Sequence, residues 1–437
     1  MVLVVIPSER IELVRICCRV PSCYAGRKSK VDPQVPRAFR GKSAPMNILV
    51  MPAWYPTNLQ PLSGSFFQEQ ALLLQKGNDV RVLHCEFVSL RPAKFLKALK
   101  ATHAEPPRGI RIGIPSIPKL AIAIGRMRAN RCIGRWIRSG WKPDVIRAHG
   151  TIWAGYFAVV AGRKFKIPVV ITEHRNPFLL DGFSRSERRK VQFAVENCAT
   201  FSGDGHFALR SVVLHGFRPQ SVAVLGNLVD ADWFYIKPPQ ASRNTFTILT
   251  ITSTKLFYKD FHTFVSAMIA FREMNSAKFI CNIVVHEDSI SDEIGQRISD
   301  HGLAENVRFH CGGVSRRDLP QFYQESDVFV STSITENFGV AMVEALMCGI
   351  PVVATRSGGA EDFINCDNGF LVDIMDSDSI ARRLHDIASR EVRFSPESVR
   401  RSVYGRYSSD PFRERLMALF REVARPEGQS TSDPHSD

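Results

Sequence analysis

The sequence has no long apolar run. No stretch of the 437-residue chain approaches the roughly 18–20 consecutive apolar residues that a membrane-spanning helix needs. Residues 2–6 (VLVVI) are too few for the core of a signal peptide, and Glu9 and Arg10 follow at once. We therefore expect a cytoplasmic chain, and its length predicts two or three domains with sizeable cores.

Metal-ligand spacing is also missing. The ten cysteines are scattered, without the short paired spacings of zinc sites, so we expect reduced thiols of a cytoplasmic protein. No Asp-x-Asp pair falls at the end of a predicted strand. We therefore predict that the protein needs no metal and no other cofactor.

Two common phosphate-binding loops are absent. Neither half of the chain opens with G-x-G-x-x-G after its first strand, and G-x-x-x-x-G-K-[ST] does not occur. Both absences weaken the dinucleotide dehydrogenase and P-loop NTPase interpretations. The first loop does hold Gly64 between two serines, just before a predicted helix. Such a glycine lets the backbone approach a phosphate closely, although a plain turn glycine is an equal alternative.

Positive charge is concentrated in one region. The chain carries a formal net charge of +14, and residues 91–144 hold thirteen Lys and Arg against Glu105 and Asp144. Lys94, Lys97 and Lys100 recur every third residue with apolar residues between them. A cationic amphipathic segment at 91–142 predicts an anionic membrane surface as partner, with a solvated basic face as the alternative. No nucleic-acid motif accompanies it, so we predict no nucleic-acid partner.

Strands and helices alternate along the chain in two series. Residues 46–235 form the first series, 236–244 a polar, proline-bearing linker, and 245–408 the second. This alternation predicts an α/β fold with two parallel sheets, whose ligands bind at the carboxyl ends of the strands. We expect residues 1–45 to be a disordered extension or the product of an upstream start, 409–425 a helix that crosses back, and 426–437 a disordered tail.

The most informative segment runs from residue 331 to 362. Glu336 lies in a polar loop after an apolar strand, Gly339 opens a short helix that contains Glu344, and a Gly-Ile-Pro turn closes the helix onto another strand. A free helix N-terminus attracts anions, because its N–H groups are unpaired and face outward. Two carboxylates beside it can accept hydrogen bonds from hydroxyls. The segment predicts a ligand with phosphates in its middle and hydroxylated rings at both ends.

Four stretches together resemble the retaining, nucleotide-sugar-dependent glycosyltransferases of family 4, also described as glycosyl transferases group 1. They are PDVIRAHGTIWAGYFAVVAGRKFKIPVVITEH, LGNLVDADWF, YKDFHTF and, above all, ENFGVAMVEALMCGIPVVATRSGG. The resemblance covers about residues 46–424. It implies the GT-B fold, in which two Rossmann-like domains face each other across a cleft. It also implies transfer of a sugar from a nucleotide-diphosphate donor to a glycan or lipid-linked acceptor, with retention and without a metal.

The resemblance assigns donor-side roles. Glu336 would contact hydroxyls of the donor sugar, Glu344 the ribose hydroxyls, and Lys259 the diphosphate. The amides of Asn337, Phe338, Gly339 and Val340 would meet the sugar and diphosphate. Five residues of helix between Gly339 and Glu344 rise roughly 7–8 Å, comparable to the reach from a phosphate to a ribose. The alternatives are a capping carboxylate for Glu336, a solvent-side glutamate for Glu344 and a surface salt bridge for Lys259.

The chain departs from the family pattern in two places. Thr254 stands where the family usually has an arginine, with Lys255 beside it as a substitute for the diphosphate contact. Val285-His286-Glu287 stands where a Gly-rich loop is usual. The nucleobase therefore stays open between uracil and guanine.

On the acceptor side, His149 matches a family histidine at a strand end, where it would contact the transferred sugar or orient the acceptor. Glu173 and His174 lie near the same edge; they contact the acceptor or, alternatively, order a loop. The resemblance implies work on a bacterial surface polysaccharide or lipopolysaccharide, in the cytoplasm or at the inner face of its membrane. An epimerase of the same fold and a non-catalytic membrane- or glycan-binding relative are the remaining alternatives.

Overall fold

The computed structural model describes most of the chain between residues 44 and 425. The described residues are 44–58, 60, 63–88, 108–116, 120–175, 180, 182–238, 245–274, 278–285, 287–312 and 314–425. They lie within one compact unit. The predictions for residues 1–43 and 426–437, for most of the linker, and for Lys94, Lys97 and Lys100 fall outside the described residues.

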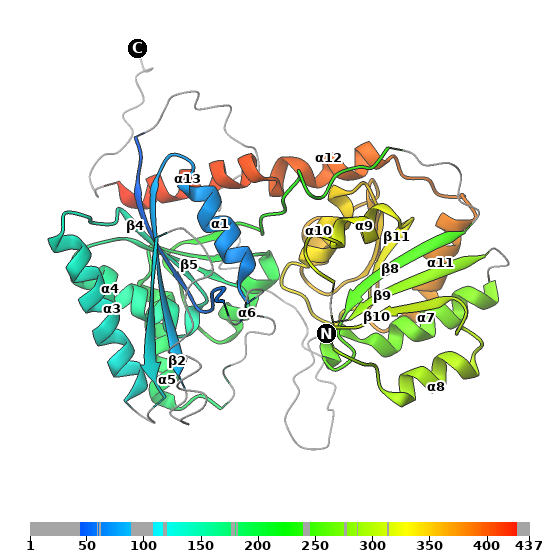
Figure 1. The fold of residues 1–437 in the computed structure, drawn as a ribbon, viewed down its shortest axis with the longest axis horizontal. Helices are drawn as coiled ribbons and strands as arrows, with labels where there is room; N and C mark the ends of the chain where they lie inside the picture. Colours follow the sequence, from blue (N-terminus) through cyan, green and yellow to red (C-terminus); the bar gives the residue numbers. More distant parts are fainter. Residues whose placement is uncertain are drawn as a thin grey trace, which may run out of the picture. The chain divides into compact units, whose positions relative to one another are not determined.

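The first series of elements forms a parallel sheet. Its strands are β1 (Asn47–Pro52), β2 (Asp79–Val88), β3 (Gly109–Pro115), β4 (Val145–His149), β5 (Val169–Glu173), β6 (Thr200–Gly203) and β7 (Val222–Val224). Their order across the sheet is β3-β2-β1-β4-β5-β6-β7, and every pairing is parallel (Figure 1). The carboxyl ends of β4, β5 and β6 therefore lie side by side at one edge.

Helices cover both faces of this sheet. They are α1 (Ser65–Gln75), α3 (Ala121–Arg138), α4 (Tyr156–Phe165), α5 (Arg185–Asn197) and α6 (His206–Leu214), and a π-helical turn at Thr151–Gly155 precedes α4. The helices α3, α4 and α5 bury their apolar faces in one core. On the other face α1 shares a core with α13 (Ser409–Ala424), the helix in which the described part of the chain ends.

The second series forms another parallel sheet. Its strands are β8 (Phe246–Thr252), β9 (Phe279–Val285), β10 (Val307–His310), β11 (Val328–Ser331), β12 (Val352–Thr355) and β13 (Gly369–Val372). Their order is β10-β9-β8-β11-β12-β13, the doubly wound order of dinucleotide-binding folds. Its helices are α7 (Phe261–Met274), α8 (Asp292–Asp300), α9 (Leu319–Gln324), α10 (Val340–Met347), α11 (Ser377–Ala388) and α12 (Pro396–Tyr407). The predicted α/β class with two Rossmann-like parallel sheets is confirmed.

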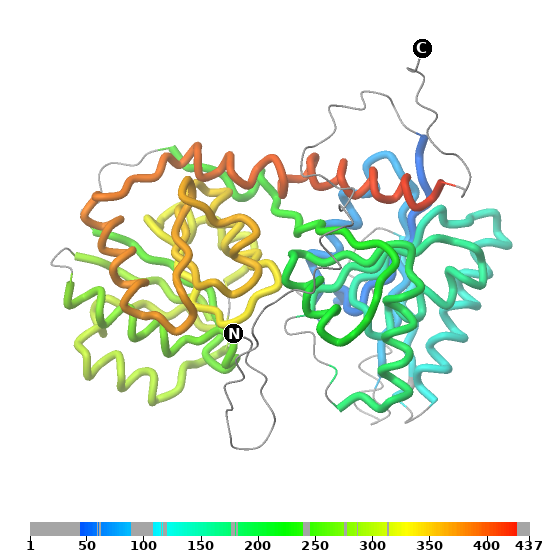
Figure 2. The backbone as a smooth tube through the Cα atoms, turned by 180° about the vertical axis from the view of Figure 1, so that it is seen from behind, coloured from blue at the N-terminus to red at the C-terminus, as the bar shows by residue number. Residues whose placement is uncertain are grey.

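Four elements were not predicted: β3, α3, β6 and α12. The arginine-rich helix α3 buries only a narrow stripe of small and apolar residues that includes Gly125, Ala129 and Ile133. The helix α12 begins with Pro396 and leads into α13 at the red end of the trace (Figure 2). Among the described residues, no helix is both long enough and apolar enough to cross a bilayer.

Candidate active site

The helix α10 begins with an uncapped N-terminus. Gly339 precedes it with φ of 87°, a left-handed conformation that favours glycine, and no side chain caps the first turn. The loop before it is tied to the residues that follow β12: Glu336 N donates to Ser357 O and Gly359 N donates to Glu336 O, each at 2.8 Å. The amides of Val340 and its neighbours are thus free of side-chain caps, as an anion site requires.

The structure brings Lys259 and Glu336 together. Lys259 Nζ donates to Glu336 Oε2 at 2.7 Å, and Ser333 Oγ approaches the same oxygen at 3.3 Å. Lys259 follows β8 and Glu336 follows β11, and these two strands are neighbours in the sheet. The two side chains are 25% and 16% exposed. A cation and a carboxylate therefore meet beside the α10 N-terminus and remain accessible to a ligand.

Glu344 is buried in α10, with an exposed fraction of 3%. Tyr323 Oη donates to its Oε2 at 2.8 Å, and Arg316 Nη1 lies 3.6 Å from its Oε1. Burial raises the pKa of Glu344 to about 7, although Arg316 and the Tyr323 hydrogen bond oppose the increase. The alternative of a solvent-side helix glutamate is therefore wrong.

Arg316 was not predicted as a site residue. Its Nη2 also donates to Glu69 Oε2 in α1 at 2.9 Å, so one guanidinium contacts a carboxylate from each of the two sheets' helices. No sequence signal marked it, because it lies in the loop before α9 and its two partners are distant in the chain.

The side chains of Phe338 and Asn337 make different contacts within the protein. The ring of Phe338 is 2% exposed and packs on Tyr407 at 5.0 Å, which fixes the loop against α12. The Asn337 amide donates to Arg175 O in the loop after β5. The ligand contacts predicted for these two residues involve their backbone amides, and they stay predictions.

The two departures from the family pattern contact each other. The Glu287 carboxylate accepts hydrogen bonds from Ser253 Oγ and, at 3.4 Å, from the Lys255 amide. Burial tends to raise the pKa of Glu287, but these hydrogen bonds, with one from the Thr254 amide, outweigh it and lower the pKa. The Lys255 side chain is exposed and does not join the Lys259–Glu336 pair, so its diphosphate contact stays a prediction.

Three strand ends of the first sheet form a hydrogen-bonded chain. Asp204 Oδ2 lies 2.8 Å from His174 Nδ1, and His174 Nε2 lies 3.0 Å from His149 Nδ1. His149 is 1% exposed, and its Nε2 has no hydrogen-bond partner among the described residues. Burial, together with Arg147 and His174, holds the pKa of His149 well below its usual range. The imidazole is therefore neutral at neutral pH.

Asp204 was missed from the sequence, because β6, the strand before it, was not recognised. Without that strand, nothing placed Asp204 at the same edge as His149 and His174. Its exposed fraction of 4% and its contact with His174 make it a positioning group for the two imidazoles.

Glu173 is fully buried and bonded to backbone. Its carboxylate accepts hydrogen bonds from the amides of Thr151 at 2.9 Å, His174 at 3.0 Å and Arg175 at 2.9 Å. These contacts favour the loop-ordering alternative for Glu173, and its contact with an acceptor stays a prediction. The same bonds hold His174 and the start of the turn that leads into α4.

Gly64 precedes α1 in a left-handed conformation, with φ of 72°. A Cβ added there would lie 2.7 Å from the carbonyl oxygen of Trp54, closer than packing allows. The position therefore requires glycine for a steric reason, and no side chain caps α1. Among the residues that the structure describes, no group of three or more His, Cys, Asp or Glu is arranged to hold a metal ion.

Known proteins resemble the chain in sequence. Residues 71–233 match the family model described as Glycosyltransferase Family 4, and residues 237–405 match Glycosyl transferases group 1. The gpi3 subunit of phosphatidylinositol N-acetylglucosaminyltransferase from Schizosaccharomyces pombe is 22% identical, over 51% of this chain and 48% of that protein. A GDP-mannose-dependent phosphatidylinositol monomannoside mannosyltransferase from Mycolicibacterium smegmatis is 38% identical, over 20% of this chain and 25% of the length of that protein. The chain thus spans about half or less of these curated relatives.

A solved structure shares the fold. The crystal structure of Anabaena Alr3699/HepE in complex with UDP superposes with a TM-score of 0.64 over 86% of this chain and 100% of that one, at 18% identity. Between them, the two family models cover most of both strand–helix series. The chain therefore belongs to glycosyltransferase family 4 and has the GT-B fold.

Proposed function

We propose that this glycosyltransferase moves a sugar from a nucleotide-diphosphate donor to a hydroxyl of a glycan or lipid-linked acceptor, with retention and without a metal. The observation that carries the proposal is the Lys259–Glu336 pair beside the uncapped N-terminus of α10. Alr3699/HepE, of the same fold, binds UDP, and the two curated relatives are named for phosphatidylinositol lipids. These names support a nucleotide donor and a lipid-linked acceptor.

In this proposal the donor lies along the start of α10. Its diphosphate accepts hydrogen bonds from the amides around Gly339 and meets the Lys259 ammonium, while its sugar hydroxyls contact Glu336. Its ribose hydroxyls donate to Glu344, one and a half turns along the helix. The positive end of the helix and Lys259 then stabilise the charge that develops on the leaving diphosphate.

No protein nucleophile is needed in this mechanism. A retaining glycosidase uses two carboxylates about 5–5.5 Å apart across the scissile bond, whereas Glu336 is paired with Lys259. The leaving phosphate helps to deprotonate the acceptor hydroxyl on the same face of the sugar. His149, neutral and held by His174, offers its Nε2 to the transferred sugar or the acceptor. The chain's main contribution is positioning and electrostatic stabilisation.

We further propose that the acceptor belongs to a bacterial surface polysaccharide or lipopolysaccharide. The enzyme would work at the cytoplasmic face of an anionic membrane, with the basic region 91–142 as its contact. Each Lys or Arg near an anionic bilayer contributes about 1 kcal/mol to such binding.

The stereochemistry of donor hydrolysis tests the reaction. Proton NMR of a nucleotide sugar with the enzyme and no acceptor should show slow release of a free sugar that first has the donor's anomeric configuration. The Glu336→Ala variant should lose this activity and keep nucleotide binding. First appearance of the opposite anomer would refute retention. Conversion into a second nucleotide sugar, without release, would favour the epimerase.

A further inference from the structure

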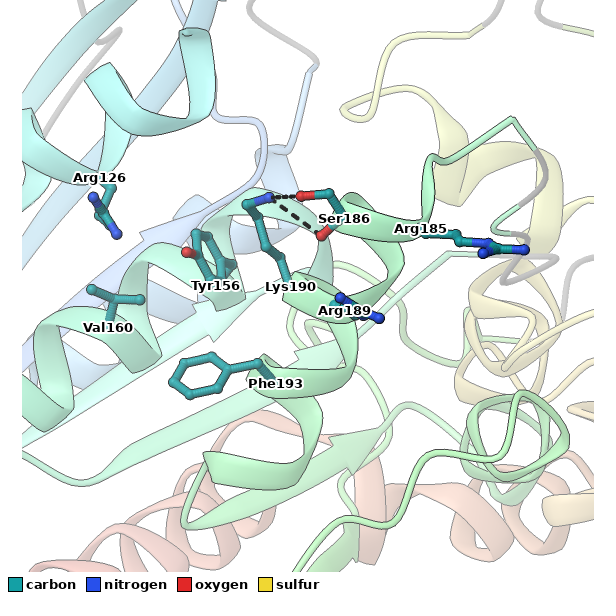
Figure 3. Close-up of a pocket in the computed structure, with 8 residues that line it drawn as sticks. All are labelled: Arg126, Tyr156, Val160, Arg185, Ser186, Arg189, Lys190 and Phe193. Atoms are coloured by element: carbon teal, nitrogen blue, oxygen red, sulfur yellow. Dashed lines mark hydrogen bonds between the residues drawn. The ribbon is translucent and has the colours of Figure 1, made fainter. Parts of the chain in front are cut away.

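A pocket opens where α3, α4 and α5 meet on one face of the first sheet. Its volume is about 650 Å³, and Figure 3 shows the eight residues that line it: Arg126, Tyr156, Val160, Arg185, Ser186, Arg189, Lys190 and Phe193. It shares no residue with the Lys259–Glu336 pair or with Glu344. The pocket was not predicted from the sequence, because five of its eight lining residues come from α5, outside the basic region.

The pocket carries positive charge with no opposing carboxylate. Four of its lining residues are Lys or Arg, and none is Asp or Glu. Within the described residues, the guanidinium groups of Arg126 and Arg189 make no hydrogen bond or ion pair, and both side chains are exposed. The nearby Glu187 is engaged elsewhere, because its carboxylate accepts from Ser184 N at 2.9 Å and Ser184 Oγ at 2.7 Å. The charge is therefore available to an anion.

One cation of the pocket is held in place. Lys190 Nζ donates to Ser186 Oγ at 2.6 Å and to Ser186 O at 3.3 Å, both drawn as dashed lines in Figure 3. Arg126 enters from α3 on the opposite side, while Arg185 extends away from Tyr156 at the rim (Figure 3). A single phosphate between Arg126 and Lys190 would have charged donors on two sides.

The rest of the pocket wall is aromatic and apolar. Tyr156 packs edge-on against Phe193 at 6.2 Å between centroids, and against Trp153 at 6.5 Å. Trp153 has a positive φ of 61° and also contacts Phe183 at 6.1 Å, so it packs behind the Tyr156 ring without lining the pocket. A free inorganic phosphate makes no use of such a wall, whereas the glycerol and acyl part of a lipid does.

The helix α3 adds exposed apolar side chains beside the same cations. Met127 is 42% exposed next to Arg126, and Leu120, just before the helix, is 54% exposed. Exposed apolar side chains among arginines are typical of helices that lie in the interface of a bilayer. The pocket therefore combines a charged centre with an apolar surround.

The pocket also lies on the acceptor side of the fold. Tyr156 begins α4 seven residues after His149, and α5 begins eleven residues after His174. Both helices start from the strand edge that carries the Asp204–His174–His149 chain. A headgroup bound in the pocket would thus be close to the edge where an acceptor is expected.

We propose that this pocket binds the phosphate of an anionic membrane lipid, with Arg126, Arg189 and Lys190 on the phosphate and Tyr156, Val160 and Phe193 on its apolar part. The inference rests on the proposed function, since it gives the membrane contact a specific site and a ligand class. The proposed ligand is a lipid in a bilayer and not a free anion, because a free anion would make no contact with the apolar wall or with the exposed Leu120 and Met127.

Vesicle co-sedimentation of the full chain tests the proposal. Phosphatidylcholine vesicles with and without phosphatidylglycerol are compared for the wild type, Arg126→Glu, Arg189→Glu and the control Arg218→Glu. Arg218 is an exposed residue that follows α6, lies outside the basic region 91–142 and does not line the pocket. Each pocket variant should bind phosphatidylglycerol vesicles at least about fivefold more weakly, the equivalent of about 1 kcal/mol per cation. The control should change less than about twofold.

Three results would overturn the site. The first is that binding of the wild type does not depend on phosphatidylglycerol. The second is that the control loses as much affinity for the vesicles as the pocket variants do, and the third is that inorganic phosphate at the headgroup concentration displaces the protein from the vesicles. The second result would mean diffuse attraction by the whole basic face, and the third a site for free phosphate. Unchanged thermal midpoints show that the variants fold. Titration with UDP and GDP, run in parallel, tests the donor site separately, so a failure of the proposed function is not confused with a failure of this pocket.

Discussion

Replacement of Glu344 by glutamine gives the sharpest test of its place in the donor site. A ribose diol donates hydrogen bonds, and an ionised carboxylate accepts them more strongly than a protonated one. The pKa of Glu344 in the free protein is raised to about 7 by burial. Nucleotide binding should therefore strengthen as the pH rises through 7, because more of the protein carries the ionised group.

The size of the effect follows from that pKa. A group with a pKa of about 7 is about one-tenth ionised one unit below it and about nine-tenths ionised one unit above it. If only the ionised form binds well, the apparent dissociation constant changes in inverse proportion to that fraction. Nucleotide affinity should then be about ten times higher at about pH 8 than at about pH 6.

Isothermal titration of the wild type and Glu344→Gln at both pH values measures this. The diphosphate also titrates near this range, but its contribution is the same in both proteins and cancels in the comparison. The glutamine variant should bind more weakly at the higher pH and show only the dependence of the diphosphate. Equal pH dependence in the two proteins would refute the assignment of Glu344 to the ribose.

Three further outcomes are expected. Since folding raises the pKa of Glu344 from 4.5 to about 7, the stability that this group contributes is present at low pH and is lost as the pH rises through 7. Between about pH 4.5 and about pH 7, the wild-type free energy of unfolding in urea should fall by about 3 kcal/mol relative to that of Glu344→Gln. A difference that stays constant with pH would contradict the raised pKa of Glu344. Lys259→Ala should weaken UDP or GDP binding about 10- to 100-fold and leave the nucleosides unaffected, because only the diphosphate meets the ammonium; equal losses for both ligands would contradict this. Gly64→Ala should lower stability by about 1–3 kcal/mol more than Gly140→Ala, since both have positive φ but only Gly64 faces a backbone oxygen within 3 Å. Matching urea midpoints would show that the steric argument is wrong.

The donor segment was predictable because its signals are local. Gly339 has to adopt a positive φ, the helix after it is short and apolar, and the Gly-Ile-Pro turn ends it, all within one stretch of sequence. The alternation of strands and helices likewise fixed the fold class, since a buried parallel strand is a short run of apolar residues. The burial of Glu344 could not be predicted from the sequence, because the residues that enclose it are distant in the chain: Tyr323 in α9 and Arg316 in the loop before α9.

Long-range contacts account for what was missed. The strand β6 has only four residues, Thr200–Gly203, and no alternating or strongly apolar pattern marks it. Without this strand, the sequence does not show that Asp204, His174 and His149 lie together, because they stand at or just after the ends of three different strands. The helix α3 was hard to recognise because its five arginines equal in number the five residues of its buried stripe. The pocket depends on α3, α4 and α5 together, so it follows only from packing.

A titration of the full chain with UDP, GDP and their sugars tests the central claim most directly. One nucleotide diphosphate should bind and raise the thermal midpoint; at about 100 times its dissociation constant, it should stabilise the protein by about 2.7 kcal/mol. The same ligand should lose most of this effect with Lys259→Ala. Absence of binding by every nucleotide diphosphate, or binding that ignores the loss of Lys259, would contradict the assignment of the donor site to α10 and its neighbouring charges.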